Sequence, residues 1–293
     1  MSCNNNCRKK HIPEPGRGFT VCDCNEELCV EPVEGCYKLH ETDWLEDYPA
    51  NIPTDIVEVR FKNTRRSYYQ NVNNLDLKRG DIVYVEGKLE GMRGRVVEIN
   101  YNFKIKLSDY KRVIGVANTD VIGEFHLAGS HFITIDEGAL KYEQVATWFK
   151  APDNEEEEYV SSSGDEVFNL NDLSGMNIKN EIAERGHEYY MENRVVYIEL
   201  NHGKGRALVT GSKTYDVEFF YKDEDITGLV CNCYCTGACK HEFATMLQLR
   251  DILAIIKNEY PFVDHNDYLA AVSKTSFFEF VIDGNTKGTF TMG

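Results

Sequence analysis

Residues 231–241 read CNCYCTGACKH, and this stretch decides how the second half of the chain folds. It holds four cysteines and a histidine, directly after an apolar run typical of a strand and directly before a run typical of a helix. Residues two apart in an extended segment project to the same side, so Cys231 and Cys233 can present two sulfur atoms to one ion. Cys239 and His241 supply the other two donors of a tetrahedron. Zinc suits such a donor set, and four protein ligands leave no open coordination position, which predicts a structural zinc site.

Two alternative roles for these cysteines stay open. They can be buried or redox-active thiols without a metal, although this spacing beside a histidine is a strong zinc signal. Disulfides account for the spacing less well, because a bridge within C-x-C is strained. Cys235 lies in the spacer and either competes as a ligand or is a spare thiol. We expect it to be spare, because four other donors already satisfy zinc.

The sequence around the cluster predicts a helix, a β-meander and a second helix. Apolar or small residues recur at helical spacing at Ile178, Ile182, Gly186 and Tyr189. Four β-like runs separated by turn residues follow, at 195–200, 206–211, 215–221 and 226–233. The run EFATMLQLRDILAII (242–256) then predicts a helix that anchors the cluster to a core.

Residues from about 178 to 256 resemble a SWIM zinc finger domain, whose signature is C-x-C, a short spacer and C-x-H. The stretch 184–220 is also similar to the helix and strand meander that precede the finger in bacterial members. The resemblance implies that the zinc ligands are Cys231, Cys233, Cys239 and His241, and Cys235 departs from its pattern. SWIM domains occur beside helicases and in transposase-like proteins, which implies nucleic-acid-linked work.

Charge is unevenly distributed along the chain. Its 293 residues carry 32 Lys+Arg and 48 Asp+Glu, for a net charge of −16. Residues 55–112 nevertheless hold 13 basic and 8 acidic residues, which leaves 19 basic and 40 acidic residues elsewhere. The total argues against a polycation that coats nucleic acid, but a local basic surface remains possible.

The basic segment reads as short strands. Val57, Val59 and Phe61 alternate with polar residues, which is the period of a strand with one wet face. More apolar runs surround the glycines of LKRGDIVYVEGKLEGMRGRVVEIN (77–100), and others follow at 103–107, 112–117 and 131–135. Short strands joined by glycine turns predict a small barrel.

Two resemblances support this barrel. Residues 35–49 and 55–87 resemble the first half of a YaaT-like domain, also known from a yeast suppressor of DNA polymerase alpha defects. The glycines at 87, 91 and 94, followed by Val96, resemble a KOW motif, a β-hairpin of SH3-like barrels that contact RNA. Together they cover about residues 36–100 and imply an SH3-like fold.

Basic and aromatic side chains of this region can contact phosphates and stack on bases. The candidate nucleic-acid-binding residues are Arg60, Lys62, Arg65, Arg66, Tyr68, Tyr69, Lys88, Arg93 and Arg95. The alternative is that the glycines only form turns and the cations only keep a barrel face soluble. A barrel that binds protein partners has the same sequence features.

A second group of cysteines lies near the N-terminus. Cys22, Cys24, Cys29 and Cys36 can form a Cys₄ zinc or iron–sulfur site. Their irregular spacing leaves open the alternative of reduced thiols in a disordered tail.

These patterns predict an α+β protein, a mostly-β SH3-like barrel followed by a SWIM domain. We expect a Cys-rich segment at 1–40, an SH3/KOW-like β domain at 41–150, an acidic linker at 151–175, a SWIM domain at 176–260 and a β-hairpin-like extension at 261–293. The linker rests on four consecutive glutamates followed by serines and a glycine. A solvated loop inside one domain is the alternative.

Several functions are disfavoured by what the sequence lacks. It has no apolar run of about 18 to 20 residues and no apolar N-terminal signal, so we expect a cytoplasmic protein without membrane contact. It has no phosphate-binding glycine loop, zinc-protease motif or nucleophile elbow, so we expect neither catalysis nor a small-molecule substrate. The prediction is a zinc-binding adaptor with DNA, RNA or protein partners; a thiol or metal sensor is the remaining alternative.

Overall fold

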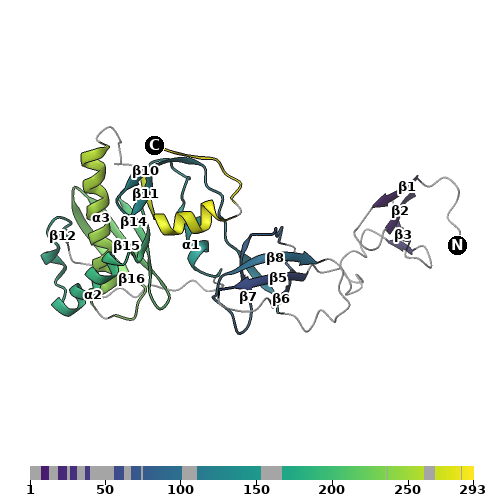
Figure 1. Cartoon of the computed structure of the whole chain (residues 1–293), viewed down its shortest axis with the longest axis horizontal. Coiled ribbons are helices and arrows are strands. Elements are labelled where there is room, and N and C mark those ends of the chain that lie inside the picture. Colours follow the sequence, from purple (N-terminus) through teal and green to yellow (C-terminus); the bar gives the residue numbers. More distant parts are fainter. Residues whose placement is uncertain are drawn as a thin grey trace. The chain divides into compact units, whose positions relative to one another are not determined.

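The computed structural model describes most of the chain, drawn in Figure 1, and the chain divides into two compact units. The described residues are 8–12, 19–24, 27–31, 37–39, 56–62, 67–73, 75–100, 111–152, 167–235, 237–260, 268–284 and 286–293, with only the backbone given before residue 40. The first unit comprises Met1–Arg79 and Tyr84–Ile114, and the second comprises Gly80–Val83 and Gly115–Gly293.

The first unit begins with a small antiparallel sheet of four strands in sequence order. Its strands are β1 (Arg8–Ile12), β2 (Phe19–Cys24), β3 (Glu27–Glu31) and β4 (Tyr37–Leu39). The predicted second metal site falls here, and the side chains of Cys22, Cys24, Cys29 and Cys36 lie outside what the structure describes.

A five-stranded sheet follows, in the order β6-β5-β8-β7-β9. Its strands are β5 (Ile56–Phe61), β6 (Ser67–Gln70), β7 (Ile82–Val85), β8 (Gly94–Asn100) and β9 (Val113–Val116). Val57, Val59 and Phe61 are buried, as their alternation predicts.

The five-stranded sheet is not a closed barrel. Between its two edge strands the described residues show a single bridge, from Gln70 to Arg112, with the Gln70 N–H donating to the Lys111 carbonyl at 2.9 Å. The mostly-β character is therefore confirmed, whereas closure, which defines an SH3-like barrel, is not. The β-like run at 103–107 lies outside the described residues.

The glycines of the predicted KOW-like hairpin serve its geometry. Gly87 and Gly91, between β7 and β8, have φ of +91° and +75°, a backbone conformation that other residues rarely adopt. A Cβ on Gly94 would lie 2.3 Å from Val59 Cγ1, so only glycine lets β8 approach β5 this closely.

A nine-stranded sheet forms the centre of the second unit, in the order β12-β16-β15-β14-β13-β17-β11-β10-β18. Its predicted meander is β13 (Val195–Asn201), β14 (Lys204–Thr210), β15 (Thr214–Lys222) and β16 (Asp225–Cys231), all antiparallel. The predicted helices before and after it are α2 (Asn180–Met191) and α3 (Lys240–Glu259). Helix, meander and second helix are therefore confirmed, with β12 (Phe168–Asn169) and the short helix η2 (Leu173–Met176) preceding them.

The other half of this sheet differs from the expected domain boundaries. Strands β10 (Gly123–Ala128) and β11 (His131–Thr134) fall within the expected β domain at 41–150, but β11 pairs with β17 (Tyr268–Ser273), which in turn pairs with β13. The C-terminal residues therefore form a central strand, α4 (Lys274–Phe277), η3 (Phe278–Ile282) and β18 (Phe290–Met292), and not a hairpin-like extension. The acidic residues 153–166 lie outside the described part of the chain, within the sequence span of the second unit.

Helices cover both faces of the nine-stranded sheet (Figure 1). On one face α3 packs on the meander, with Met246, Leu249 and Ile256 fully buried. On the other face α1 (Tyr142–Phe149) and the segment α4–η3 bury Trp148 and Phe280. The unit is thus an α+β sandwich with the sheet in the middle layer.

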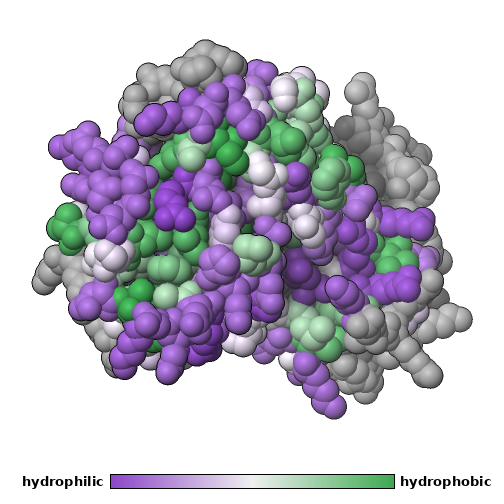
Figure 2. Space-filling view, turned by 60° about the vertical axis from the view of Figure 1, so that its left-hand side comes forward, coloured by the Kyte–Doolittle hydropathy of each residue, from purple (hydrophilic) through white to green (hydrophobic). Residues whose placement is uncertain are grey.

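Hydrophilic side chains cover much of the visible surface, with hydrophobic ones in smaller groups between them (Figure 2). Among the helices that the structure describes, none has both the length and the apolar character that a membrane crossing requires.

Candidate metal centre

The four predicted ligands converge at one place in the second unit. Cys231 ends β16, Cys233 lies two residues further on, and Cys239 and His241 belong to the start of α3. Their ligand atoms all lie within 4.8 Å of one another. Nδ1 of His241 is 3.7 Å from the sulfur of Cys231 and 3.7 Å from that of Cys239.

These distances fit a tetrahedral metal. Zinc binds thiolate sulfur at about 2.3 Å and imidazole nitrogen at about 2.0–2.1 Å, which places tetrahedral S and N ligands about 3.6 Å apart. The observed separations of 3.7 Å match this value. Three sulfurs and one nitrogen, with Cys239 and His241 buried, therefore form a candidate metal centre.

The start of α3 positions two of the four ligands, Cys239 and His241. Cys239 is the N-cap residue: its sulfur accepts the Glu242 N–H at 3.5 Å, and the Glu242 carboxylate accepts the Cys239 N–H at 2.7 Å. This reciprocal pair fixes the entry to the helix. With a metal bound, the positive end of the helix would also stabilise a Cys239 thiolate.

His241 is positioned by packing of its ring. The ring is 3% exposed and stacks on Tyr215, with centroids 4.0 Å apart and planes 18° apart. Tyr189 packs against it at 5.4 Å, edge to face. Nε2 of His241 is buried and has no hydrogen-bond partner among the described residues. In many metal sites a hydrogen bond from the second ring nitrogen orients the histidine ligand. Here the packing of Tyr189 and Tyr215 orients the ring of His241 instead.

Without a metal, the three thiols hold their protons unequally. Hydrogen bonds from the thiols of Cys231 and Cys239 lower the pKa of Cys233. The hydrogen bond to Cys233 raises the pKa of Cys231, and hydrogen bonds to both other cysteines, together with burial, raise that of Cys239. Burial also raises the pKa of Glu242 to about 7. A metal that binds all three sulfurs must therefore displace protons.

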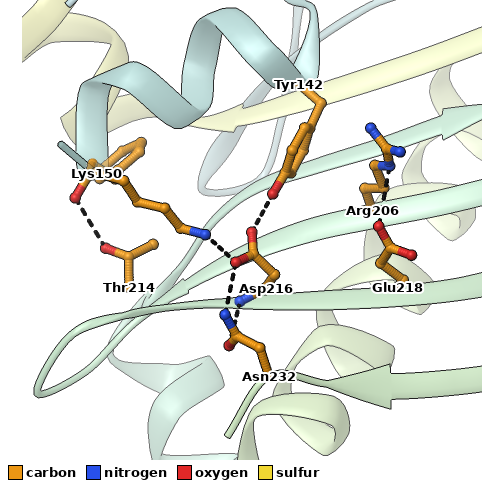
Figure 3. A network of polar contacts seen from close by, with 8 residues as sticks. Tyr142, Lys150, Arg206, Thr214, Asp216, Glu218 and Asn232 are labelled. Carbon is orange, nitrogen blue, oxygen red and sulfur yellow. Dashed lines mark hydrogen bonds and ion pairs between the residues drawn. The ribbon is translucent and has the colours of Figure 1, made fainter. Parts of the chain in front are cut away.

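Residues 232–239 join β16 to α3 and are called the metal loop here. Asn232, between the ligands Cys231 and Cys233, ties this loop to β15 (Figure 3). Its side-chain oxygen accepts the Asp216 N–H at 3.0 Å, and its side-chain nitrogen donates to the Asp216 carboxylate at 2.9 Å. Its own backbone N–H donates to the Asp216 carbonyl at 3.1 Å. These bonds continue the β15–β16 pairing by one residue beyond Val217 and Cys231.

Asp216 carries this link through to α1 on the other face of the sheet. Its carboxylate, on a residue that is 2% exposed, accepts hydrogen bonds from the Tyr142 hydroxyl and the Lys150 ammonium as well as from Asn232 (Figure 3). A buried carboxylate needs such partners, because burying it unpaired is costly. The metal loop is therefore fastened to a satisfied polar network.

Cys235 lies outside the group of four ligands. It is exposed, and the neighbouring Tyr234 is 97% exposed. The expectation that Cys235 is a spare thiol agrees with this placement.

The predicted nucleic-acid-binding residues are placed unequally. Arg60, Lys62 and Lys88 are exposed, Tyr68 is 44% exposed, and Arg93 and Arg95 are half-buried. Tyr69 is only 7% exposed and packs edge-on against Phe61, so its ring is not available for stacking on a base. Arg65 and Arg66 lie outside the described residues.

Sequence reasoning missed the residues that hold the ligands in place. The alternation of side chains in an extended segment puts Asn232 on the side opposite to Cys231 and Cys233, which the sequence already indicates. Its partner Asp216, and the ring of Tyr215 against His241, follow only from the pairing of β15 with β16.

Comparisons with protein-family models, with curated proteins and with solved structures find no match to this chain. The class of site is defined by its geometry alone: it is a candidate Cys₃His metal centre at the junction of a β-meander and a helix. The SWIM, YaaT-like and KOW resemblances stay predictions.

Proposed function

We propose that the chain is a zinc-binding, non-catalytic adaptor whose second unit is a SWIM-type finger domain. The observation that carries the proposal is the approach of four ligand atoms, from Cys231, Cys233, Cys239 and His241, to within 4.8 Å of one another.

Zinc is the metal that this donor set favours. Thiolates and imidazole are its preferred ligands, and a set of four closes the coordination sphere, which is typical of a structural site. Binding of such an ion contributes about 10 kcal/mol or more to folding of small zinc domains. In this chain the ion would fasten β16 to α3, which are joined in sequence by a short loop.

Metal analysis of the purified full chain tests this role. We expect about one zinc ion per chain in the wild type, and a cobalt-loaded form with the absorption of tetrahedral thiolate coordination. Cys233→Ser should lose most of the metal. Cys235→Ser is the matched control, because it changes an exposed cysteine in the same loop that is outside the ligand group. Equal metal content in the two variants would refute the ligand assignment.

For the first unit we infer a nucleic-acid-binding role, in line with its SH3-like and KOW-like resemblances. Arg60 and Arg95 are direct partners in the β5–β8 ladder, so two cations project from the same face. Two guanidinium groups on neighbouring strands can both donate hydrogen bonds to one phosphate, since arginine is suited to phosphate recognition. Tyr68 is paired with Glu58, two residues before Arg60, which adds an exposed ring to this face. A phosphate between the arginines and a base on the ring fit this arrangement.

Binding of a labelled mixed-sequence single strand, measured at several salt concentrations, tests this second role. The double variant Arg60→Ala/Arg95→Ala should weaken binding and lower the salt slope by about 0.7 for each phosphate that the arginines neutralise in the wild type. Lys222→Ala is a control, because Lys222 is an exposed cation of the second unit. No binding by the wild type would refute the nucleic-acid role and favour a protein partner.

A further inference from the structure

A second aromatic and basic surface surrounds the candidate metal centre. It is built by the end of α2, the turn between β14 and β15, the metal loop and the first residue of α3. We call it the finger surface; its cations are Arg194, Lys213 and Lys240, and its rings are Tyr189, Tyr215 and Tyr234.

Cation–ring contacts make the finger surface continuous. The Arg194 guanidinium and the Lys240 ammonium lie 4.6 Å and 4.3 Å from the centre of the Tyr189 ring. The Lys213 ammonium lies 5.8 Å from the rings of both Tyr215 and Tyr234. Since Tyr189 and Tyr215 both pack on His241, the two groups meet at the metal ligand.

The charge of this surface contrasts with the rest of the chain. Outside residues 55–112 acidic residues outnumber basic ones, 40 to 19. Three cations nevertheless gather here, and among them Arg194 has an ion pair with Glu192 at 2.5 Å. Glu192 offsets the charge of Arg194, and a zinc ion with three thiolates and a neutral histidine would carry one further negative charge, so these groups together keep one net positive charge. The surface therefore favours an anionic partner.

The exposed ring of Tyr234 indicates which kind of anionic partner fits the finger surface. Its ring is 97% exposed, next to the Lys213 ammonium and directly after the ligand Cys233. An exposed ring beside cations fits a base and its phosphates, because bases stack on aromatic side chains while Lys and Arg contact the backbone. A duplex keeps its bases stacked inside, so only an unpaired base can lie on this ring.

We propose that the finger surface binds single-stranded nucleic acid, with a base stacked on Tyr234 and phosphates held by Lys213, Lys240 and Arg194. This rests on the proposed adaptor function and adds a contact site in the second unit. Because Tyr234 follows Cys233 and Lys240 lies between Cys239 and His241, a metal bound by these ligands would hold the ring and this cation in place together.

Fluorescence anisotropy with a labelled mixed-sequence single strand of about 15 nucleotides tests the proposal on the zinc-loaded full chain. Tyr234→Ala should weaken binding roughly 5- to 150-fold, the loss expected for one stacked base. Tyr234→Phe keeps the ring and should bind within about twofold of the wild type. Lys213→Ala should lower the salt slope by about 0.7. Lys222→Ala, at the other end of β15, should leave both the affinity and the slope unchanged.

The outcomes separate this proposal from the adaptor function. Unchanged binding by Tyr234→Ala, together with weaker binding by Arg60→Ala/Arg95→Ala, would overturn the finger surface and leave the first unit's role standing. Equal competition by a duplex or by polyglutamate would also overturn it, because neither can stack on the ring. Zinc content, measured on the same samples, reports separately on the metal centre.

Discussion

Replacing Asn232 by alanine should loosen the metal centre without touching a ligand. The change removes two side-chain hydrogen bonds, one from the Asp216 N–H and one to the Asp216 carboxylate. A neutral hydrogen bond contributes about 0.5–1.5 kcal/mol and one to a charged group about 1.5–3 kcal/mol. We therefore expect Asn232→Ala to cost the zinc-loaded protein about 2–4 kcal/mol. The backbone bond from Asn232 to the Asp216 carbonyl stays.

This loss should appear both in metal affinity and in thermal stability. Outer residues that orient metal ligands are typically worth 10- to 100-fold in affinity. Competition with a chromogenic chelator measures the affinity, and thermal unfolding should shift down by roughly 5–15 °C. Asn258→Ala, an exposed asparagine late in α3, is the matched control and should behave as the wild type.

A second variant sharpens the test of this link. Asn232→Asp has nearly the same shape but places a carboxylate against that of Asp216, so it should cost more than Asn232→Ala. Wild-type zinc affinity and an unchanged unfolding temperature in both variants would show that Asp216 and Asn232 do not position the ligands.

Three further predictions concern pH and packing. Lowering the pH from about 8 to about 6 should weaken zinc binding. The raised pKa values of Cys231 and Cys239 keep both thiols protonated, so zinc must displace these protons, which costs more at lower pH. Competition with a chelator at each pH measures the affinity. Burial lowers the pKa of His131 to about 4 in the folded protein, whereas the pKa in the unfolded chain is about 6.5. Between these pH values only the unfolded chain binds a proton at His131. The free energy of unfolding should therefore be highest above pH about 6.5 and fall by about 3 kcal/mol towards pH 4. Urea unfolding of metal-free wild type and His131→Asn checks this, and an equally steep pH dependence in the variant would contradict it. Trp148→Ala should cost about 3–5 kcal/mol in urea unfolding, because the ring is fully buried and stacks on Phe280 at 5.1 Å; a loss below about 1 kcal/mol would contradict this packing.

The meander and the four ligands could be predicted because their signals are local. Strands β13 to β16 alternate or run apolar between turn residues, and each pairs with its neighbour in sequence. The ligands lie within eleven residues, so chain geometry alone brings them together.

The pairing of β17 with β11 could not be predicted from local sequence patterns. Strand β17 is buried along its whole length, so it lacks the alternation that marks a half-exposed strand. Its partner β11 precedes it by more than a hundred residues, and no local pattern encodes that pairing.

Tyr68 and Tyr69 show a subtler limit. Neighbours in a strand point to opposite faces, so only one of the two rings can lie on the outside. The sequence predicts this alternation but does not say which ring packs on Phe61, since both are tyrosines.

The position of β17 also sets an order for synthesis. Residues 195–241, with the meander and all four candidate metal ligands, are synthesised and emerge from the ribosome before β17 (Tyr268–Ser273) does. Until then β11 and β13 each lack a neighbour on one side and expose an unpaired strand edge, which invites association with other chains. The nascent protein therefore passes through a stage in which its metal ligands are all present while its sheet remains split in two.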